Sequence, residues 1–209
     1  KEKKIECDIL LRCKSHLENG KNLRNLELDD NELKWIKHLN LITIKPLIYV
    51  ANIDESIIEE DNNHVKELEV IADKENLKII KICASLEEQL YDLNDDEKLL
   101  FLDDYGIKDS GLNRLINASY DTLRLITFFT AGEKEVRAWT VKNGSKAPKA
   151  AGVIHTDFEK GFIKAEVISY NHYIKYGSEL KCKESGKLSI EGKDYIVNDG
   201  DVMHFRFNV

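Results

Sequence analysis

The sequence predicts two folds in succession, an α/β segment over residues 1–122 and an α+β segment over residues 123–209. Glycines are uneven: Gly20 is the only one before Gly106, and the other ten of the eleven follow. Net charge changes sign near the same place, with 17 Lys+Arg against 27 Asp+Glu before position 123 and 14 against 11 after it. The apolar pattern also changes, from helices around two longer apolar runs to short β-rich runs between glycines. These changes place a domain boundary near residue 122.

The bulk composition is that of an ordinary water-soluble protein of 209 residues, 42% hydrophobic and 33% charged, which is enough for one large or two small domains. No run of 18 apolar residues occurs, so no membrane partner is expected. The first residues lack the apolar core of a signal peptide, and the four cysteines are scattered. These features predict a cytoplasmic protein with reduced thiols and no metal-ligand cluster.

The front segment alternates helices and strands. Apolar residues at helical spacing predict a helix over 5–19, and Asp29 or Asp30 is a suitable N-cap for the next. Two β-branched apolar runs, 47–51 and 77–83, are typical of parallel strands buried on both faces. Further helices are predicted over 65–74, 99–103 and 111–123. This order indicates a βαβ unit in an open parallel sheet.

The back segment is dominated by short strands. A tight turn at 198–201 leads into the last of them. Two short helices are predicted, over 170–176 and 178–184. A small mixed sheet crossed by a helix is the β-grasp arrangement. The predicted strands are 125–131, 135–141, 162–169, 188–190, 194–197 and 202–207.

Three stretches of the back segment resemble a known family. They are LITFFTAGEKEVRAWT at 125–140, AAGVIHTDFEKGF at 150–162 and DGDVMHFRFNV at 199–209. They resemble the C-terminal TGS domain of the YchF family, P-loop ATPases related to the Obg GTPases. The resemblance is closest to the bacterial form and extends back to about Leu23. It implies three parts: the end of a helical (coiled-coil) insertion at 1–40, the last part of a parallel-sheet P-loop NTPase domain at 41–122, and a β-grasp (ubiquitin-like) TGS domain at 123–209.

The resemblance also implies a function. Members of the family bind ATP with Mg²⁺ and hydrolyse it slowly, in association with the ribosome, in translation and stress control. A P-loop ATPase needs a G-x-x-x-x-G-K-[ST] loop, and this sequence has none. We therefore expect the chain to be the back part of a longer protein, to bind no nucleotide tightly by itself and to hydrolyse none. No catalytic residue and no metal ligand is assigned to it.

The strand at 47–51 ends in Asn52-Ile53-Asp54-Glu55. In the related GTPases this place holds N-K-x-D, whose Asp accepts hydrogen bonds from N1–H and the 2-amino group of guanine. Here Glu55 replaces that Asp and Ile53 replaces the Lys, the N-x-x-E form that the family associates with ATP. The resemblance makes Asn52 the adenine contact. By itself the four-residue pattern is better explained as a capped turn after a strand, and its position after a buried strand and before the next motif favours the nucleotide contact.

A second motif, Cys83-Ala84-Ser85, follows the strand at 77–83, where the family has S-A-K-x-E and the base meets a backbone N–H. Ala84 matches that pattern. Cys83 stands in place of serine and Ser85 in place of lysine, so a backbone contact is retained while the side-chain contacts differ. Cys83 is interpreted as a small core residue, and alternatively as a redox-sensitive thiol near the base.

The back segment supplies the candidate RNA contacts. Basic side chains bind phosphates without sequence preference, and TGS domains are implicated in RNA or ribosome contact. The ribosome (large subunit) and RNA are the expected partners, and DNA is not expected. His155-Thr156-Asp157 is interpreted as a helix start capped by Thr156 or Asp157 rather than as catalytic. The basic candidates are Arg137, Lys142, Lys146, Lys149, Lys160 and Lys164.

A second interpretation belongs to another class of protein. A TGS domain without catalytic motifs predicts a non-catalytic RNA- or ribosome-binding adaptor module. The presence or absence of a glycine-rich lysine loop upstream of Lys1 distinguishes the two interpretations.

Overall fold

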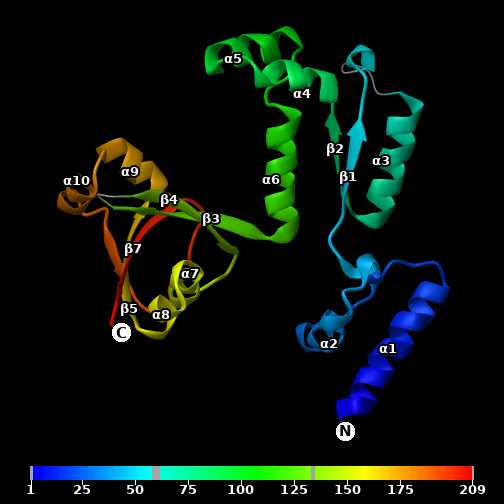
Figure 1. The fold of residues 1–209 in the computed structure, drawn as a ribbon, viewed down its shortest axis with the longest axis horizontal. Helices are drawn as coiled ribbons and strands as arrows, with labels where there is room; N and C mark the ends of the chain where they lie inside the picture. The colour runs from blue at the N-terminus through cyan, green and yellow to red at the C-terminus, as the bar shows by residue number, and fades with distance from the viewer. Residues whose placement is uncertain (1, 58–61, 133–134, 209) are drawn as a thin grey trace. The chain divides into compact units, whose positions relative to one another are not determined.

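A computed structural model describes residues 2–57, 62–132 and 135–208. The chain divides into two compact units, Lys1–Thr122 and Leu123–Val209, here called unit 1 and unit 2 (Figure 1). Glu133, Lys134 and Val209, which belong to the stretches that carry the family resemblance, lie outside the described residues. No helix in the described part of the chain combines the length and the apolar character needed to cross a membrane.

Unit 1 begins with a small helical cluster. It contains α1 (Glu2–Glu18), η1 (Leu23–Asn25), α2 (Asp30–Ile36), η2 (Lys37–Leu39) and η3 (Ile42–Ile44). Ile9 and Cys13, one helical turn apart on α1, are buried against Leu23 and Ile36. Burial raises the pKa of the Cys13 thiol, so this cysteine is a core residue rather than a reactive one.

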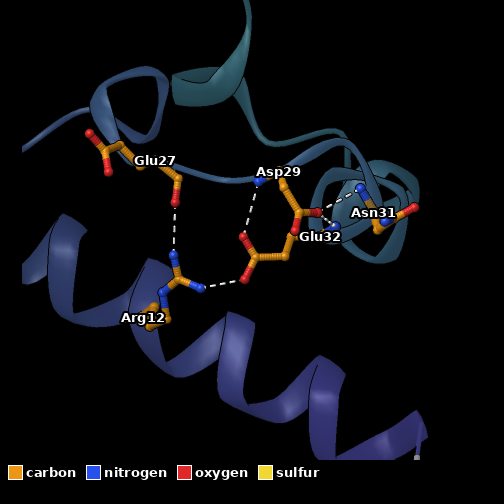
Figure 2. A network of polar contacts seen from close by, with 5 residues as sticks. All are labelled: Arg12, Glu27, Asp29, Asn31 and Glu32. Atoms are coloured by element: carbon orange, nitrogen blue, oxygen red, sulfur yellow. Dashed lines mark hydrogen bonds and ion pairs between the residues drawn. The ribbon is translucent and has the colours of Figure 1, made fainter.

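A polar network joins α1 to the start of α2 (Figure 2). Asp29 is the N-cap of α2, and its carboxylate accepts from the amides of Asn31 and Glu32 at 2.7 and 2.8 Å. Glu32 reaches back to the Asp29 amide and also pairs with Arg12 of α1. Arg12 further donates to the Glu27 carbonyl at 2.8 Å. The N-cap prediction at Asp29 or Asp30 is therefore confirmed at Asp29, in a complete capping box.

The centre of unit 1 is a pair of parallel strands, β1 (Ile48–Asn52) and β2 (Lys78–Ile82), as predicted. Helix α3 (Asn63–Glu75) connects them, and Figure 1 shows α3 and α6 (Gly111–Leu123) on opposite sides of the pair. The prediction that both strands are buried on both faces is wrong for this structure. No residue of β1 or β2 is fully buried, and Val50 is 47% exposed, because two strands offer little surface to cover one another.

Two more helices complete unit 1, α4 (Ala84–Tyr91) and α5 (Asp95–Asp104). Helix α4 is not among the predicted elements, although Leu86 and Leu90 lie one turn apart and are both buried. Its residue Glu87 accepts from the amides of Gly111 and Leu112 at 2.6 and 3.2 Å. A carboxylate at these amides stabilises the start of α6.

Unit 2 is a five-stranded mixed sheet in the order β4-β3-β7-β5-β6, in which β3 and β7 are parallel and the other pairs antiparallel. Five of the six predicted strands are present, shifted by at most one residue. The elements are β3 (Leu125–Ala131), β4 (Val136–Lys142), α7 (Ala147–Ile154), α8 (Thr156–Lys160), β5 (Phe162–Ser169), α9 (Tyr170–Tyr176), α10 (Glu179–Glu184), β6 (Ser189–Glu191) and β7 (Asp201–Phe207).

The core of unit 2 lies between one face of this sheet and α7. Phe128 is fully buried and meets Phe205 edge to face at 5.9 Å. Ala147, Ala150 and Ala151 of α7 are completely buried, because small side chains let the helix lie close to the strands. Alternation along the strands places Glu166, Ile168 and His204 on the opposite face, where Ile168 is buried as well.

Two predictions in unit 2 are wrong. The strand predicted at 194–197 is a loop with a single bridge between Lys146 and Ile196. Two backbone hydrogen bonds, from the Ala147 amide to the Tyr195 carbonyl and from the Val197 amide to the Ser145 carbonyl, flank this bridge, and the Tyr195 hydroxyl donates to Asp201 at 2.8 Å. The N-cap of α8 is His155, whose Nδ1 accepts from the Asp157 amide at 3.2 Å, rather than Thr156 or Asp157.

Candidate functional site

The structure brings the two loop motifs of unit 1 together. Because β1 and β2 are parallel, their carboxyl ends meet at the same edge, where ligands bind in open α/β sheets. Asn52 is the last residue of β1, and Cys83, directly after β2, is the N-cap of α4. The Ile53 amide donates to the Ile82 carbonyl at 2.8 Å and extends the ladder by one bond. Here this group is called the loop-end site: Asn52, Ile53, Glu55, Cys83, Ala84 and Ser85.

Two side chains cross between the loops. The Ala84 amide donates to Oδ1 of Asn52 at 3.2 Å. The Ser85 hydroxyl donates to Oε1 of Glu55 at 2.7 Å, a short bond of the charge-assisted kind. Asn52 and Glu55 thus connect the two loops.

Gln89 also belongs to the site and is missing from the predicted residues. Its Nε2 donates to the same Oε1 of Glu55 at 3.4 Å. Ser85 and Gln89 are four residues apart on α4 and therefore share one face of that helix. Their spacing was visible in the sequence, but it points to Glu55 only once the helix is recognised.

Asp54 and Cys83 have structural roles beside these contacts. Asp54 accepts from the amide and hydroxyl of Ser56 at 3.1 and 2.9 Å, and the amide hydrogen bond is the main cause that lowers the pKa of Asp54. Cys83 is only 7% exposed, with its Sγ 3.2 Å from the Ser85 hydroxyl. Its burial agrees with the interpretation as a small core residue.

A cavity of about 330 Å³ opens beside the loop-end site, within unit 1. Ile53 and Cys83 belong to both the site and the cavity wall. Leu86 and Leu90 of α4 add apolar surface, together with Phe101 of α5. The loop-end site therefore presents polar groups beside a cavity whose wall includes apolar side chains, which suits the edge and the ring of a flat heterocycle.

The six basic candidates of unit 2 do not share one surface. Arg137 lies on the face of β4 that turns toward the helices, with its guanidinium 4.2 Å from the centre of the Trp139 ring. Lys142 points to the opposite face, since its neighbour Val141 is buried in the core. Lys164 lies on that second face as well, because its neighbour Ala165 is a core residue.

The remaining basic candidates lie on or before the helices. Lys146 is the N-cap residue of α7 and pairs with Asp194 at 2.7 Å, which is the main cause of the lowered pKa of Asp194. Lys149 on α7 pairs with Glu159 at 3.8 Å. Lys160 ends α8. Acidic partners thus reduce the positive potential of this surface at two of the three positions.

The outer face of the unit 2 sheet holds a charged cluster that the sequence does not reveal. Oxygens of Glu166 and Glu179 and a ring nitrogen of His204 all lie within 4.8 Å of one another. Arg206 already donates to Glu166 at 3.0 Å, and that hydrogen bond is the main cause of the lowered pKa of Glu166. A metal ion here would have to displace a cation that is already bound, so the cluster is better explained as a set of ion pairs.

Comparison with known proteins gives consistent matches along the chain. The family model YchF-GTPase_C, described as a protein of unknown function (DUF933), matches residues 125–208. Proteins called "Ribosome-binding ATPase YchF" match all 209 residues at 52% identity in Pasteurella multocida and over 211 aligned positions at 46% in Bacillus subtilis. The chain spans 57% and 58% of the length of those two proteins.

Solved structures agree with the sequence matches. The structure of the Schizosaccharomyces pombe YchF GTPase superposes with a TM-score of 0.86 at 34% identity, over 98% of this chain and 55% of that one. A GTP-binding protein from Pyrococcus horikoshii superposes with a TM-score of 0.56 at 18% identity, which shows likeness of fold alone. The mixed α/β fold, with one parallel and one mixed sheet, is therefore shared with a solved relative.

Proposed function

The chain belongs to the YchF family, and on that premise we propose that it is the C-terminal part of a ribosome-associated P-loop ATPase acting in translation or stress control. The observation that carries this proposal is the loop-end site. Its two loops meet at the carboxyl edge of parallel strands, in contact through Asn52 and Glu55, in a chain 52% identical to a protein named for ATP hydrolysis. A ribosome-bound ATPase of this kind would act in the cytoplasm.

Asn52 fits an adenine base. Its Oδ1 accepts from the Ala84 amide, so the amide nitrogen is the end that remains to donate. Adenine N7 is an acceptor and would receive that hydrogen bond. Ile53, which lines the neighbouring cavity, would supply apolar contact to the ring.

The phosphates and Mg²⁺ of ATP would be bound elsewhere in a longer protein. This sequence has no G-x-x-x-x-G-K-[ST] loop, and its relatives are longer than the chain. Glycine-loop amides and a lysine supply most of the phosphate interaction in P-loop proteins. We use "full-length protein" for this chain together with the N-terminal part that its relatives carry.

Unit 2 is proposed to be a β-grasp TGS domain that contacts the ribosome, on its large subunit, or RNA. Its mixed sheet packs on α7, and residues 125–208 match the family model. Arg137, Lys142, Lys146, Lys149, Lys160 and Lys164 are its candidate phosphate contacts. They divide into an outer-face pair, Lys142 and Lys164, and a helix-side group.

The first test measures nucleotide binding and hydrolysis in both proteins. We expect the full-length protein to hydrolyse ATP and the 209-residue chain to give no turnover above a buffer blank. Asn52→Ala should weaken ATP binding to the full-length protein by about 1–3 kcal/mol, the loss expected when a buried hydrogen-bonding edge is stranded. Asn31→Ala, on the exposed side of α2, is the control. Equal ATP affinity in the two variants would contradict the assignment of Asn52.

The second test separates the ATPase from the alternative, a non-catalytic adaptor. Co-sedimentation with ribosomes is compared for the full-length protein and the chain, with and without ATP. Lys142→Glu/Lys164→Glu and Lys149→Glu/Lys160→Glu change net charge equally on the two surfaces of unit 2. Loss of binding in one pair locates the contact, and binding should weaken as salt rises. Nucleotide-independent binding by the chain alone would favour the adaptor.

A further inference from the structure

The contact between Glu55 and helix α4 has a consequence for the choice of nucleotide. Oε1 of Glu55 accepts from the Ser85 hydroxyl at 2.7 Å and from the Gln89 side-chain amide at 3.4 Å. Both donors come from α4. This oxygen is therefore engaged by side chains of the protein itself.

Guanine recognition requires the opposite arrangement. A carboxylate that reads guanine presents its oxygens to two donors, N1–H and the 2-amino group. A guanine donor would meet the same carboxylate, so it would have to replace the Ser85 hydroxyl in a charge-assisted hydrogen bond of the same kind. As long as Oε1 is bound to α4, Glu55 cannot present both oxygens to guanine.

We propose that Ser85, assisted by Gln89, is a positioning residue that determines base selectivity by holding the Glu55 carboxylate on α4. The inference rests on the proposed function, since it assumes that the loop-end site holds the base of a nucleotide. It goes further than the replacement of Asp by Glu. A longer side chain alone leaves the carboxylate able to rotate toward a base, whereas the bond to Ser85 fixes where it points.

Cys83 ties Ser85 to the interior. The buried Cys83 thiol lies 3.2 Å from the Ser85 hydroxyl, and Cys83 directly precedes the first residue of α4. The Ser85 hydroxyl thus contacts the buried Cys83 thiol on one side and Glu55 on the other. Its orientation is therefore supported by a core residue, although Ser85 itself is exposed. This support distinguishes it from the Ser56 hydroxyl, which is bound to Asp54 within its own loop at 2.9 Å.

The test measures the ratio of the GTP and ATP dissociation constants in the full-length protein by calorimetry. Ser85→Ala frees Oε1, and we expect GTP to bind about tenfold more tightly relative to ATP, the fold-change equal to about 1.4 kcal/mol. Ser85→Thr keeps a hydroxyl and should retain the original ratio. Gln89→Ala should change the ratio about two- to threefold, because its longer bond is weaker. Ser56→Ala is the matched control and should leave the ratio unchanged.

A double variant tests whether the effect passes through Glu55. In Ser85→Ala/Glu55→Gln the side chain has one acceptor oxygen and cannot read two guanine donors, so the gain in GTP binding should disappear. An unchanged ratio in Ser85→Ala, with its melting temperature retained, would overturn the inference while leaving the proposed function in place. Failure of the wild-type protein to bind either nucleotide would overturn the proposed function, and the inference with it.

Discussion

The two sheets of this protein are stabilised by different means. In unit 2 the strands bury alternate side chains against α7, and Phe128, Val167, Met203 and Phe205 form one core. In unit 1 the β1–β2 pair has no fully buried residue in either strand. The difference shows that regular parallel pairing does not by itself provide a core, which depends on how much apolar surface lies on each face.

In unit 1, where few apolar side chains are buried around the strands, polar contacts connect the loops that follow β1 and β2. At the carboxyl end of the β1–β2 pair, Asn52 bonds to Ala84 and Glu55 to Ser85, all of them exposed residues. Such contacts are directional but contribute little net stability each. At this edge the two loops are therefore positioned relative to each other by polar side chains rather than by buried apolar surface.

The comparison predicts first a large difference in local stability. We expect the amides of β3 and β7 to exchange with solvent orders of magnitude more slowly than those of β1 and β2, a gap of several kcal/mol in opening free energy. Hydrogen exchange on the 209-residue chain measures this directly. We also expect residues 123–209 expressed alone to unfold cooperatively in urea. Equal protection of both sheets in a monomeric sample would contradict the comparison.

A matched pair of truncations tests the same contrast at single residues. Phe128→Ala removes a fully buried ring from unit 2 and should cost about 3–5 kcal/mol of unfolding free energy. Val50→Ala, at a 47% exposed position of β1, should cost less than about 1 kcal/mol. Urea denaturation followed separately for each unit gives both values. Similar costs at the two positions would show that β1 is packed as tightly as β3.

The sequence is a good guide to unit 2 and a weaker one to unit 1, for physical reasons. Strands β3 and β5 lie at their predicted bounds because alternation and glycine turns are local signals. The predicted strand at 194–197 is a loop with a single bridge, and the contact of its Tyr195 with Asp201, the first residue of β7, leaves no periodicity in the sequence. In unit 1 the strands are correctly located, but their burial depends on neighbours that a local pattern does not specify.

In the loop-end site, too, the contacts between distant residues could not be predicted from local sequence patterns. Its six residues could be named because their motifs resemble those of the family, and the two parallel strands explain why the motifs meet at one edge. Gln89 could not be named from the sequence, because it reaches Glu55 only through helix α4, which was not predicted. The pairing of Glu55 with Ser85 could not be predicted either, because it depends on side-chain geometry. The six basic residues show the reverse, since residues of one kind in one segment lie on different faces of a sheet and on its helices.

The third prediction concerns the buried carboxylate of Asp201 in unit 2, where we expect a smaller change in unfolding free energy. Asp201 is buried and accepts from the Tyr195 hydroxyl at 2.8 Å and from the Asn198 amide at 2.9 Å. Tyr195→Phe removes one donor from a buried carboxylate and should cost about 1–3 kcal/mol. Asn198→Ala, which retains the amide, should cost less. Equal stability of Tyr195→Phe and wild type would mean that water replaces the hydroxyl.

The same contact predicts a dependence on alkaline pH. Burial, and then the hydrogen bond to Asp201, raise the pKa of Tyr195 to about 12. Because the folded-state pKa lies above the unfolded value near 10, the stabilisation is present below pH 10 and is lost as pH rises toward 12. Unfolding free energies measured from pH 8 upward should fall for the wild type more steeply than for Tyr195→Phe.

The smallest effect is expected at the outer-face pair of Arg206 and Glu166, whose atoms are 3.0 Å apart. Arg206→Ala should cost about 0.5–1 kcal/mol at neutral pH, the range of a partly exposed ion pair. Arg206 is the main cause that lowers the pKa of Glu166, so the stabilisation is present above the carboxyl's ordinary pKa and is lost as pH falls through its lowered value. The difference between wild type and Arg206→Ala should therefore shrink on acidification. A difference that stays constant down to pH 2 would show that Arg206 acts through packing of its side chain and not through its charge.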